Sequence, residues 1–441
     1  MSYFSPLYTA DEMRAAEQGH DVETMMEQAG RAVAHAVLQR YPDARRVAAV
    51  CGKGANGGDG RIALRVLQEA GREVSEDLHE SADVVIDGLF GTGFRGEPRA
   101  EAAALIERIN AAGIPVVAVD VPSGVNASTG EIAGAAVCAD VTVTMHARKV
   151  GVVVAPGRFQ AGDVVVADIG IEDAGTEHQL VTADILREVP RKREPVTKYS
   201  AGSVLVVGGS PGMTGAVCLA AEAAFRADAG YVAVAVPEAS LPVVETRLLE
   251  PVKATLDRVD ELAERASAVA LGPGLGRGEE ERALVRRLLA ELELPAVVDA
   301  DALFELEPGD WPAPRVLTPH AGELGRLLGE KSEWVDAHRL EAVRRAAEQF
   351  RCVVLLKGAD TLVGAPGGGV LVSDSGGPEL ATAGTGDVLT GIISAFLAKG
   401  MDARLAAAAG AFVHGRAAEL APQRSGLIAS DVVEALPRAL A

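Results

Sequence analysis

Residues 46–71 read RVAAVCGKGANGGDGRIALRVLQEAG, and this stretch decides the fold class. An apolar run, Arg46–Cys51, is followed by a glycine-rich segment, Gly52–Gly60, and then by the helical pattern of Arg61–Gly71. An unbroken apolar strand that leads through glycines into a helix is typical of a parallel sheet with helices on both faces. The stretch therefore predicts an α/β protein.

The same alternation of short apolar runs and helical stretches occupies most of the chain. Further strands are expected at Val84–Gly88, Pro115–Val121, Ser203–Gly208, Ala268–Gly272, Ala296–Asp299, Arg315–Thr318 and Cys352–Lys357. The alternation breaks once, in a polar segment rich in proline and charge, and we place a domain boundary near residues 172–182. A chain of 441 residues is long enough for two cores of ordinary size.

Composition excludes several classes of function. The net charge of −20 argues against nucleic-acid binding, which needs basic side chains to displace counterions. The N-terminus has no signal pattern, and no apolar run approaches the length of a membrane span, so we expect no membrane contact and a soluble, cytoplasmic protein. The four cysteines are far apart and are expected to be buried free thiols.

The glycine-rich segment of residues 52–60 admits two interpretations. Gly52, Gly54 and Gly57 satisfy the GxGxxG pattern of a dinucleotide site, and acidic Glu76 and Asp77 follow about 20 residues later. This interpretation predicts a hydride-transfer enzyme. Asn56 and Asp59 inside the segment suit a cation or a polar ligand better than a bare pyrophosphate turn.

Polar side chains follow three strands of the predicted N-terminal sheet. Asn56 and Asp59 follow the first strand, Asp87 ends the second, and Asp120 and Ser123 follow the third. The carboxyl ends of parallel strands meet at one edge, where ligands bind, so these groups are expected to form one site. Oxygens of Asn, Asp and Ser are suitable ligands for a hard cation.

The second half offers a serine-hydrolase alternative. Gly208–Gly212 reads GGSPG, which matches the nucleophile-elbow pattern, and Asp299 or Asp301 and His320 follow in the required order. Pro211 directly after Ser210 has no N–H for an oxyanion hole, which disfavours this alternative.

Residues Gly384–Gly391, GTGDVLTG, place a carboxylate where a helix N-terminus should bind phosphate. Lys357 emerges from a buried strand and is expected to meet an anion, for which phosphate is the natural candidate. Nucleotide phosphates on the amides of residues 384–386 would leave Asp387 beside them as a general base for an attacking hydroxyl.

Taken in order, these strings resemble the bifunctional NAD(P)H-hydrate repair family over nearly the whole chain. Residues 1–175 are similar to the epimerase domain in NGGDG, DGLFGTGFRG and VDVPSGVNASTG, and residues 182–441 to the ADP-dependent dehydratase domain in GPGLG, LTPHAGEL, LLKGADT and ATAGTGDVLTG. The resemblance implies a Rossmann-like three-layer αβα domain followed by a ribokinase-like αβα domain. The first would epimerise R- and S-hydrates at C6, and the second would phosphorylate the C6 hydroxyl of the S-hydrate with ADP and eliminate it, giving AMP and phosphate.

The resemblance also implies roles for individual residues. Asp387 and Asp120 would be catalytic, with Lys149 a weaker candidate for assisting Asp120, and K⁺ would bind Asn56, Asp87 and Ser123. ADP with its Mg²⁺ would contact Lys357, Gly358, Ala359, Asp360, Thr361 and Gly386. The dehydratase substrate would contact Ala216, Gly274, Gly276, His320 and Asp387. The epimerase substrate would contact Ala55, Asn56, Gly57, Gly58, Asp59, Gly91, Thr92, Gly93, Phe94, Arg95, Gly96, Glu97 and Asp120. Domains of both kinds often self-associate, so a homo-oligomer is expected.

Three departures from the family pattern are visible. Ala55 replaces the first of two asparagines, Thr197-Lys198-Tyr199 stands where HKG is frequent, and the stretch from Gly71 to Val84 is short enough to suggest a trimmed strand–loop unit. Two alternatives remain. The chain could be a ribokinase-like vitamin-alcohol kinase fused to a non-catalytic module, or its first domain could be a binding module like those of RNA-decapping scaffolds.

Overall fold

The computed structural model describes residues 3–192, 194, 197–198 and 200–441, which form two compact units. The N-terminal unit comprises Pro6–Gln179 with Asp336–His338, and the C-terminal unit comprises the described residues up to Ser5, Leu180–Val335 and Arg339–Ala441. The change of unit at residues 179–180 falls within the segment expected from sequence. Two short segments, the residues up to Ser5 and Asp336–His338, belong to the opposite unit from the one that the sequence predicts. Of the residues Thr197–Tyr199, which depart from the family pattern, Tyr199 lies outside the described residues.

The N-terminal unit contains a parallel sheet of six strands in the order β3-β2-β4-β5-β6-β7. The strands are β2 (Arg46–Cys51), β3 (Glu73–Ser75), β4 (Val84–Gly88), β5 (Val116–Val119), β6 (Val141–Met145) and β7 (Asp163–Ala167). The predicted strands β2 and β4 are confirmed at both ends. The last two strands were not predicted, since β6 alternates threonine with apolar residues and β7 is partly exposed.

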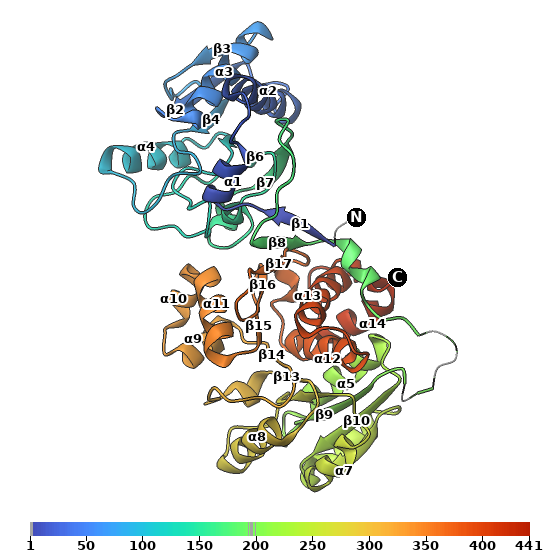
Figure 1. Cartoon of the computed structure of the whole chain (residues 1–441). Helices are drawn as coiled ribbons and strands as arrows, with labels where there is room; N and C mark the ends of the chain where they lie inside the picture. The colour runs from blue at the N-terminus through green and yellow to red at the C-terminus, as the bar shows by residue number, and fades with distance from the viewer. Residues whose placement is uncertain (1–2, 193, 195–196, 199) are drawn as a thin grey trace. The chain divides into compact units, whose positions relative to one another are not determined.

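Helices cover both faces of this sheet, as predicted. The first face carries α2 (Val22–Arg40) and α3 (Ala55–Glu69) over a core of alanine and valine, while α4 (Ala100–Ala111) packs on the other face through Ile106 and Ile109 (Figure 1). The short helix α1 (Ala10–Ala16) precedes them. The polypeptide between β3 and β4 contains no helix in its eight described residues, 76–83, so this connection is unusually short for parallel strands.

The C-terminal unit is built on a sheet of eleven strands in the order β1-β8-β17-β16-β15-β14-β13-β12-β9-β10-β11. Its parallel part comprises β9 (Ser203–Val207), β10 (Tyr231–Val236), β11 (Val252–Thr255), β12 (Ala268–Leu271), β13 (Ala296–Val298), β14 (Arg315–Leu317) and β15 (Val353–Leu356). Sequence reasoning missed the antiparallel extension through β16 (Thr361–Gly364) and β17 (Leu371–Ser373). Two further strands, β1 (Phe4–Leu7) and β8 (His178–Val181), lie beyond β17 at the edge of the sheet. The chain passes from one unit to the other within each of them.

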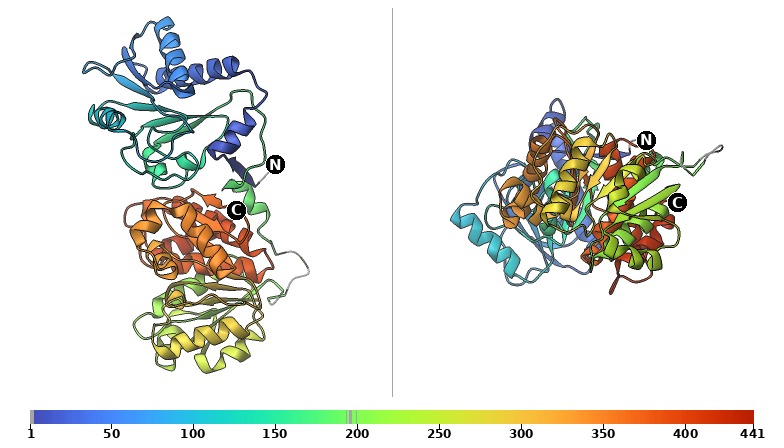
Figure 2. Two further views of the ribbon diagram at one scale, coloured as in Figure 1. Left: turned by 60° about the vertical axis from the view of Figure 1, so that its left-hand side comes forward. Right: turned by 90° about the horizontal axis from the view of Figure 1, so that it is seen from below.

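Helices lie on both sides of this sheet (Figures 1 and 2). One side carries α5 (Thr214–Arg226), α12 (Thr385–Ala398), α13 (Ala403–Leu420) and α14 (Ala429–Ala439), which pack largely through alanine. The other carries α7 (Val259–Ala263) and α8 (Glu279–Glu291), and α6 (Leu241–Arg247), α9 (Ala321–Leu328), α10 (Ser332–Ala337) and α11 (Arg339–Phe350) complete the unit. A Cβ at Gly391 would lie 2.2 Å from the carbonyl oxygen of Ala220, so glycine permits the close approach of α12 to α5.

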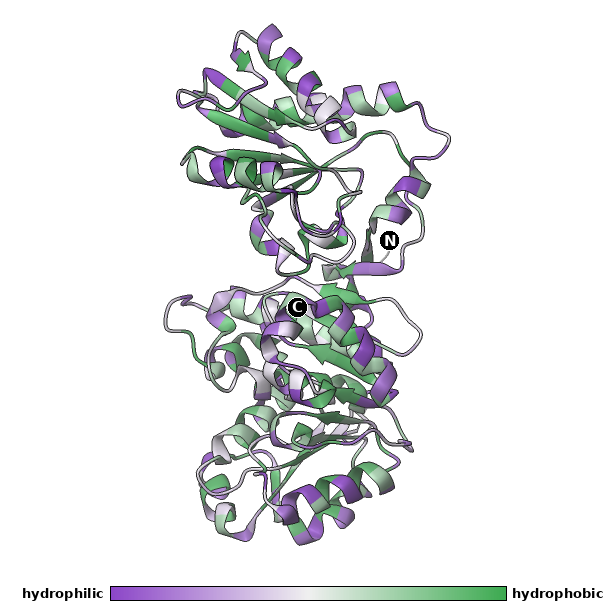
Figure 3. Ribbon diagram, turned by 90° about the vertical axis from the view of Figure 1, so that its left-hand side faces the viewer, coloured by the Kyte–Doolittle hydropathy of each residue, from purple (hydrophilic) through white to green (hydrophobic). Residues whose placement is uncertain are grey.

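Apolar residues occupy the strands of both sheets, and polar residues occupy the outer faces of the helices (Figure 3). Within the described ranges, no helix is both long and apolar enough to cross a membrane. All four cysteines are free thiols, as predicted, but only Cys218 and Cys352 are buried, and Cys138 is exposed. Burial raises the pKa of the Cys352 thiol to about 12, which makes it a poor nucleophile.

Candidate active sites

Most of the glycine-rich segment after β2, from Ala55 onward, is the start of a helix and not a loop. Helix α3 begins at Ala55, so Asn56 and Asp59 lie in its first two turns. A Cβ at Gly57 would lie 2.0 Å from the carbonyl oxygen of Gly52, which explains why only glycine fits this close turn. The acidic residue expected of a hydride-transfer site, Glu76, forms an ion pair with Arg61 instead.

Asn56, Asp87 and Ser123 meet at the carboxyl edge of the sheet, as predicted. The side-chain amide of Asn56 donates to the carbonyl oxygens of Val119 (2.6 Å) and Phe90 (3.2 Å), which leaves its Oδ1 as an acceptor. The hydroxyl and amide of Ser123 donate to the carboxylate of Asp87, at 2.6 and 2.8 Å.

This cluster has oxygen ligands and lacks positive charge. Asp87 is fully buried, burial raises its pKa, and no described cationic side chain forms an ion pair with it. A Cβ at Gly91 would lie 2.5 Å from Oδ1 of Asn56, so glycine keeps that oxygen open. The residues present therefore fit a hard cation.

Asp120 lies beside this cluster and forms a buried ion pair with Lys149. Lys149 Nζ lies 2.5 Å from Asp120 Oδ1, which also accepts from Thr144 Oγ1 and the amide of Met145, both at 3.0 Å. The Lys149 side chain is completely buried. Asp120 has a φ of 68°, in the left-handed region that non-glycine residues seldom adopt, and such strain is concentrated at functional sites.

Asp59 is the second acid of the N-terminal site. It is 6% exposed, and its Oδ1 has no hydrogen-bond partner among the described residues. Burial, followed by the charges of Asp120 and Glu17, raises the pKa of Asp59 to about 7. Burial and the charge of Asp120 also raise the pKa of Glu17, which ends a short helix and to which the sequence analysis assigned no role.

The predicted substrate loop of residues 91–97 follows β4 and is largely exposed. Its Phe94 stacks on Phe90 with ring centroids 4.5 Å apart, and Arg95 Nη2 lies 3.5 Å from Asp11 Oδ2. Gly93 and Gly96 have open space where a Cβ would stand, unlike Gly91. The remaining predicted contacts, Ala55, Gly57, Gly58, Thr92 and Glu97, flank the cluster on α3 and this loop.

The C-terminal site is centred on the first turn of α12. Gly384, with a φ of 92°, precedes the helix, and the amide of Thr385 is engaged by Thr382 O, so the first-turn amides of Gly386 and Asp387 remain for a ligand. A Cβ at Gly386 would lie 3.4 Å from Lys357 Nζ, which shows that the ammonium adjoins this helix end. A helix N-terminus and an ammonium together attract phosphate.

Asp387 lies in this turn and makes no hydrogen bond or ion pair with the described side chains. Burial, followed by the charge of Asp299, raises the pKa of Asp387 to about 7, and Lys357 opposes this rise. A carboxylate with a pKa near neutrality is well matched to general-base catalysis.

Lys357 meets a carboxylate of the protein, where sequence reasoning expected phosphate. Its Nζ lies 2.8 Å from Oδ1 of Asp299 and 4.0 Å from Oε2 of Glu323. Burial acts to lower the pKa of Lys357, but these two carboxylates outweigh it, and the pKa is raised. Lys357 is thus a permanent cation.

The predicted nucleotide segment, residues 357–361, connects β15 to β16. Buried Arg339, at the start of α11, holds it by donating to the carbonyl oxygens of Lys357 (3.3 Å) and Asp360 (2.7 Å) and by an ion pair of 3.0 Å with the Asp360 carboxylate. Asp360 is completely buried, so its carboxylate shapes this turn rather than facing a ligand. Gly358 adjoins Arg339, and Ala359 and Thr361 complete the connection.

The predicted dehydratase contacts Ala216 and Gly274 are neighbours, since a Cβ at Gly274 would lie 3.3 Å from that of Ala216. Gly276 follows, and its amide donates to Asp301 Oδ2 at 2.9 Å. The hydrolase alternative is wrong, because the Ser210 hydroxyl donates to the carbonyl oxygen of Leu275 and the other expected members of a triad are engaged elsewhere.

His320 begins helix α9 and forms a capping box with Glu323. Its Nδ1 accepts from the amides of Gly322 (3.0 Å) and Glu323 (3.3 Å), so the neutral ring carries its proton on Nε2. The imidazole is 57% exposed and can offer that proton to a ligand.

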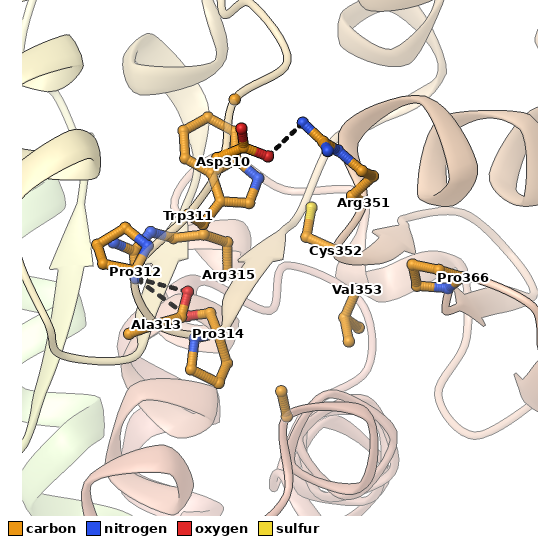
Figure 4. A pocket seen from close by; sticks show the side chains of 12 residues that line it. Asp310, Trp311, Pro312, Ala313, Pro314, Arg315, Arg351, Cys352, Val353 and Pro366 are labelled. Atoms are coloured by element: carbon orange, nitrogen blue, oxygen red, sulfur yellow. Dashed lines mark hydrogen bonds and ion pairs between the residues drawn. The ribbon is translucent and has the colours of Figure 1, made fainter.

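A hollow of about 530 Å³ lies at the opposite, amino-terminal ends of β14 and β15 (Figure 4). Its cationic side chains are already engaged. The guanidinium of Arg315 donates to several backbone carbonyls, among them those of Leu289 and Leu292 at the end of α8, and Arg351 pairs with Asp310. Nε of Arg315 is buried and has no hydrogen-bond partner among the described residues.

The fold and the two carboxylate sites define a two-unit α/β enzyme whose C-terminal unit is ribokinase-like. That fold is shown by a ribokinase-like superfamily protein from Enterococcus faecalis, with a TM-score of 0.54 at 24% identity over 61% of this chain and 97% of the other. The YjeF-related N-terminal family model matches residues 22–76 and 72–151, and the NAD(P)H-hydrate dehydratase model matches residues 204–438.

The chain belongs to the family of bifunctional NAD(P)H-hydrate repair enzymes. The member from Moorella thermoacetica is 38% identical over 94% of this chain and 92% of its own, and that from Escherichia coli is 33% identical over 98% and 93%. An ADP/ATP-dependent NAD(P)H-hydrate dehydratase from Bacillus subtilis, co-crystallised with ATP and Mg²⁺, aligns with a TM-score of 0.55 and 29% identity, covering 58% of this chain and 96% of its own.

Proposed function

We propose that the protein repairs hydrated NADH and NADPH at two sites. The N-terminal unit interconverts the two C6 epimers of the hydrate, and the C-terminal unit dehydrates the S-epimer at the expense of a nucleotide. The observation that carries this proposal is the arrangement in the first turn of α12, where an unpaired carboxylate, two first-turn amides and an ammonium adjoin one another.

In the C-terminal unit, the amides of Gly386 and Asp387 and the ammonium of Lys357 bind the terminal phosphate of ADP or ATP. Mg²⁺, bound to the phosphates, would neutralise further charge there. Asp387 takes the proton from the C6 hydroxyl, whose oxygen then forms a bond to the terminal phosphorus as the nucleotide's bridging oxygen departs. The phosphate ester is a better leaving group than hydroxide, so loss of phosphate from C6 and of a proton from C5 restores the dihydronicotinamide.

The remaining predicted contacts surround this base. Ala216, Gly274, Gly276 and the Nε2–H of His320 would bind the hydrate, and the residue 357–361 connection would bind the nucleotide. These roles rest on the family resemblance and on the positions described above. The two glycines carry φ angles of 59° and 95°, which other residues rarely adopt.

In the N-terminal unit, Asp59 and Asp120 form an acid–base pair of unequal character. The hydrate is a hemiaminal, so its C6 hydroxyl can leave with a proton as water while the ring nitrogen supplies the electrons. Asp59, which retains its proton up to a pH of about 7, donates that proton. Asp120, which pairs with Lys149, accepts the proton of the water that adds to the opposite face of C6. A K⁺ ion held by Asn56, Asp87 and Ser123 would supply the positive charge that this cluster lacks.

A single assay tests the proposal. The protein is incubated with a mixture of both hydrate epimers, ATP or ADP, and Mg²⁺, and the absorbance of reduced nicotinamide is followed. Conversion of both epimers is expected. Conversion of the S-epimer alone would show that the N-terminal unit does not epimerise the hydrate, and no conversion, with phosphate transferred to a vitamin alcohol, would overturn the proposal in favour of a kinase.

A further inference from the structure

Asp299 joins three elements of the C-terminal site. It follows β13 directly, and it is 1% exposed. Its Oδ1 accepts from Lys357 Nζ (2.8 Å), at the end of β15, and its Oδ2 accepts from Thr390 Oγ1 (2.7 Å), on α12. The family resemblance assigns no role to Asp299 or Thr390, and sequence reasoning considered Asp299 only for a hydrolase.

The contact with Asp299 decides where the ammonium of Lys357 stands. Three carboxylates compete for this cation, since Glu323 Oε2 is 4.0 Å away and the charges of Asp299 and Asp387 also act on it. The 2.8 Å contact goes to Asp299 alone. A flexible lysine deprived of that contact would turn toward one of the other two.

We propose that Asp299 is a positioning residue of the dehydratase: it holds Lys357 beside the N-terminus of α12 and keeps that ammonium from pairing with Asp387. The proposal rests on the proposed function of the C-terminal unit. The lysine thereby meets the incoming phosphate, and the base remains available to the hydroxyl.

The charges around Asp387 come from several elements. Asp299 and Asp301 after β13 and Lys357 after β15 act on Asp387, Glu323 on α9 acts on Lys357, and Lys357 in turn acts on His414 of α13. His414 is neutral at the pH of interest, because burial lowers its pKa to about 4. On the packed helices α5 and α14, Glu222 pairs with Arg247 and Asp431 accepts from the amide of Ile428.

Removing the charge of Asp299 acts on Asp387 in one direction. Asp299 raises the pKa of Asp387, and Lys357 lowers it. In Asp299→Asn the raising charge is lost and the lysine is freed to approach Asp387, so both effects lower that pKa. The acid limb of the pH–rate profile should move down by about one pH unit or more, and kcat above pH 7 should fall about tenfold because the base is weaker and partly paired.

The experiment uses the full chain with S-hydrate, ATP and Mg²⁺, and it measures kcat and KM from about pH 5 to about pH 9. Asp260→Asn, which removes an exposed carboxylate paired with Arg287, is the matched control and should reproduce the parent profile. Thr390→Val removes the other hydrogen bond to Asp299 without changing its charge, so it should lower kcat while leaving the limb in place.

A fall in kcat of Asp299→Asn at every pH, without movement of the limb, would overturn the proposal and leave Asp299 a purely structural residue. A profile identical to that of the parent would also overturn it. Should Asp299→Asn fail to fold, Lys357→Gln replaces it: the limb should then move to higher pH, and an unmoved limb would contradict the inference. If the parent protein does not convert the hydrate, titration of the Asp387 carboxyl by carbon NMR in the parent and in Asp299→Asn measures the same pKa shift. Failure of the proposed function can therefore be told apart from failure of this inference.

Discussion

The ammonium of Lys149 lies 2.5 Å from the carboxylate of Asp120, and the Lys149 side chain has no exposed surface. Lys149 also donates to the carbonyl oxygen of Met145 at 2.7 Å, so the lysine is fixed from two sides. A buried pair of this kind depends on both partners, because a lone charge left inside the protein is costly.

Lys149→Met should abolish epimerase activity while leaving the dehydratase intact. Removal of one partner from a buried pair destabilises a domain by about 3–5 kcal/mol, so the melting transition of the N-terminal unit should fall as well. Calorimetry and the S-hydrate assay measure the two effects. Arg31→Met removes an exposed ion pair with Glu27 and should change neither; equal loss of both activities in Lys149→Met would contradict the prediction.

Gly91→Ala should impair the epimerase strongly, because the added Cβ would lie 2.5 Å from Oδ1 of Asn56 and 3.0 Å from its Cγ. A loss of at least about tenfold in kcat/KM is expected for a displaced ligand oxygen. Gly175→Ala, in the same unit but outside the predicted site and with open space at its Cβ position, is the matched control and should retain activity. Equal rates for the two variants would show that the oxygen of Asn56 is not used.

Asp59→Asn should make the protein more stable in mild alkali and less active. The pKa of Asp59 is raised to about 7 in the folded protein, so the folded state holds a proton that the unfolded state has released above about pH 4. Stability is therefore lost as the pH rises from about 4 to about 7, and asparagine avoids this loss. We expect a gain of about 4 kcal/mol at pH 8, since each pH unit of the shift is worth about 1.4 kcal/mol, and none at pH 4. Denaturant titrations at both pH values measure it, and a gain of the same size at both would rule out this cause.

Asp387→Asn should lose dehydratase activity by at least about a hundredfold, while nucleotide binding is retained or strengthened because a negative charge next to the phosphates is removed. Equilibrium dialysis with labelled ATP measures binding, and the S-hydrate assay measures turnover. Epimerisation of the R-hydrate provides an internal control in the same sample. Turnover equal to that of the parent would exclude Asp387 as the base.

The strands that lead into the glycine motifs could be predicted because they are apolar runs bounded by glycine, as at Arg46–Cys51 and Val84–Gly88. Strand β6 was not predicted because threonines interrupt its apolar residues. In the structure these threonines are buried, and the hydroxyl of Thr142 donates to the carbonyl oxygen of Ala161. The beginning of α3 was misplaced because three of its first six residues are glycine, which has a low helix propensity.

The predicted roles came from motifs, but the contacts that support the site residues could not be read from motifs. Arg339 on α11, Thr390 on α12 and Glu17 at the end of α1 reach the sites through tertiary packing, which no local pattern records, although Thr390 itself stands in the GTGDVLTG stretch. The contact between Lys357 and Asp299 was not predicted for the same reason. The cost of burying an ammonium predicted that Lys357 meets an anion. Only the positions of β13 and β15 in the sheet show that Asp299 is such an anion.

Strands β1 and β8, by which the chain enters and leaves the N-terminal unit, are adjacent in one sheet. The epimerase half is thus inserted after the first strand of the dehydratase half, and a single cut near residue 180 would strip that first strand from the second enzyme. Separate expression of the dehydratase would instead call for excision of residues 6–179 with a short splice between the flanking strands. One enzyme of this polypeptide is thus inserted within the sequence of the other. A gene for the dehydratase alone would arise more readily by deletion of an internal segment than by division of the gene at one point.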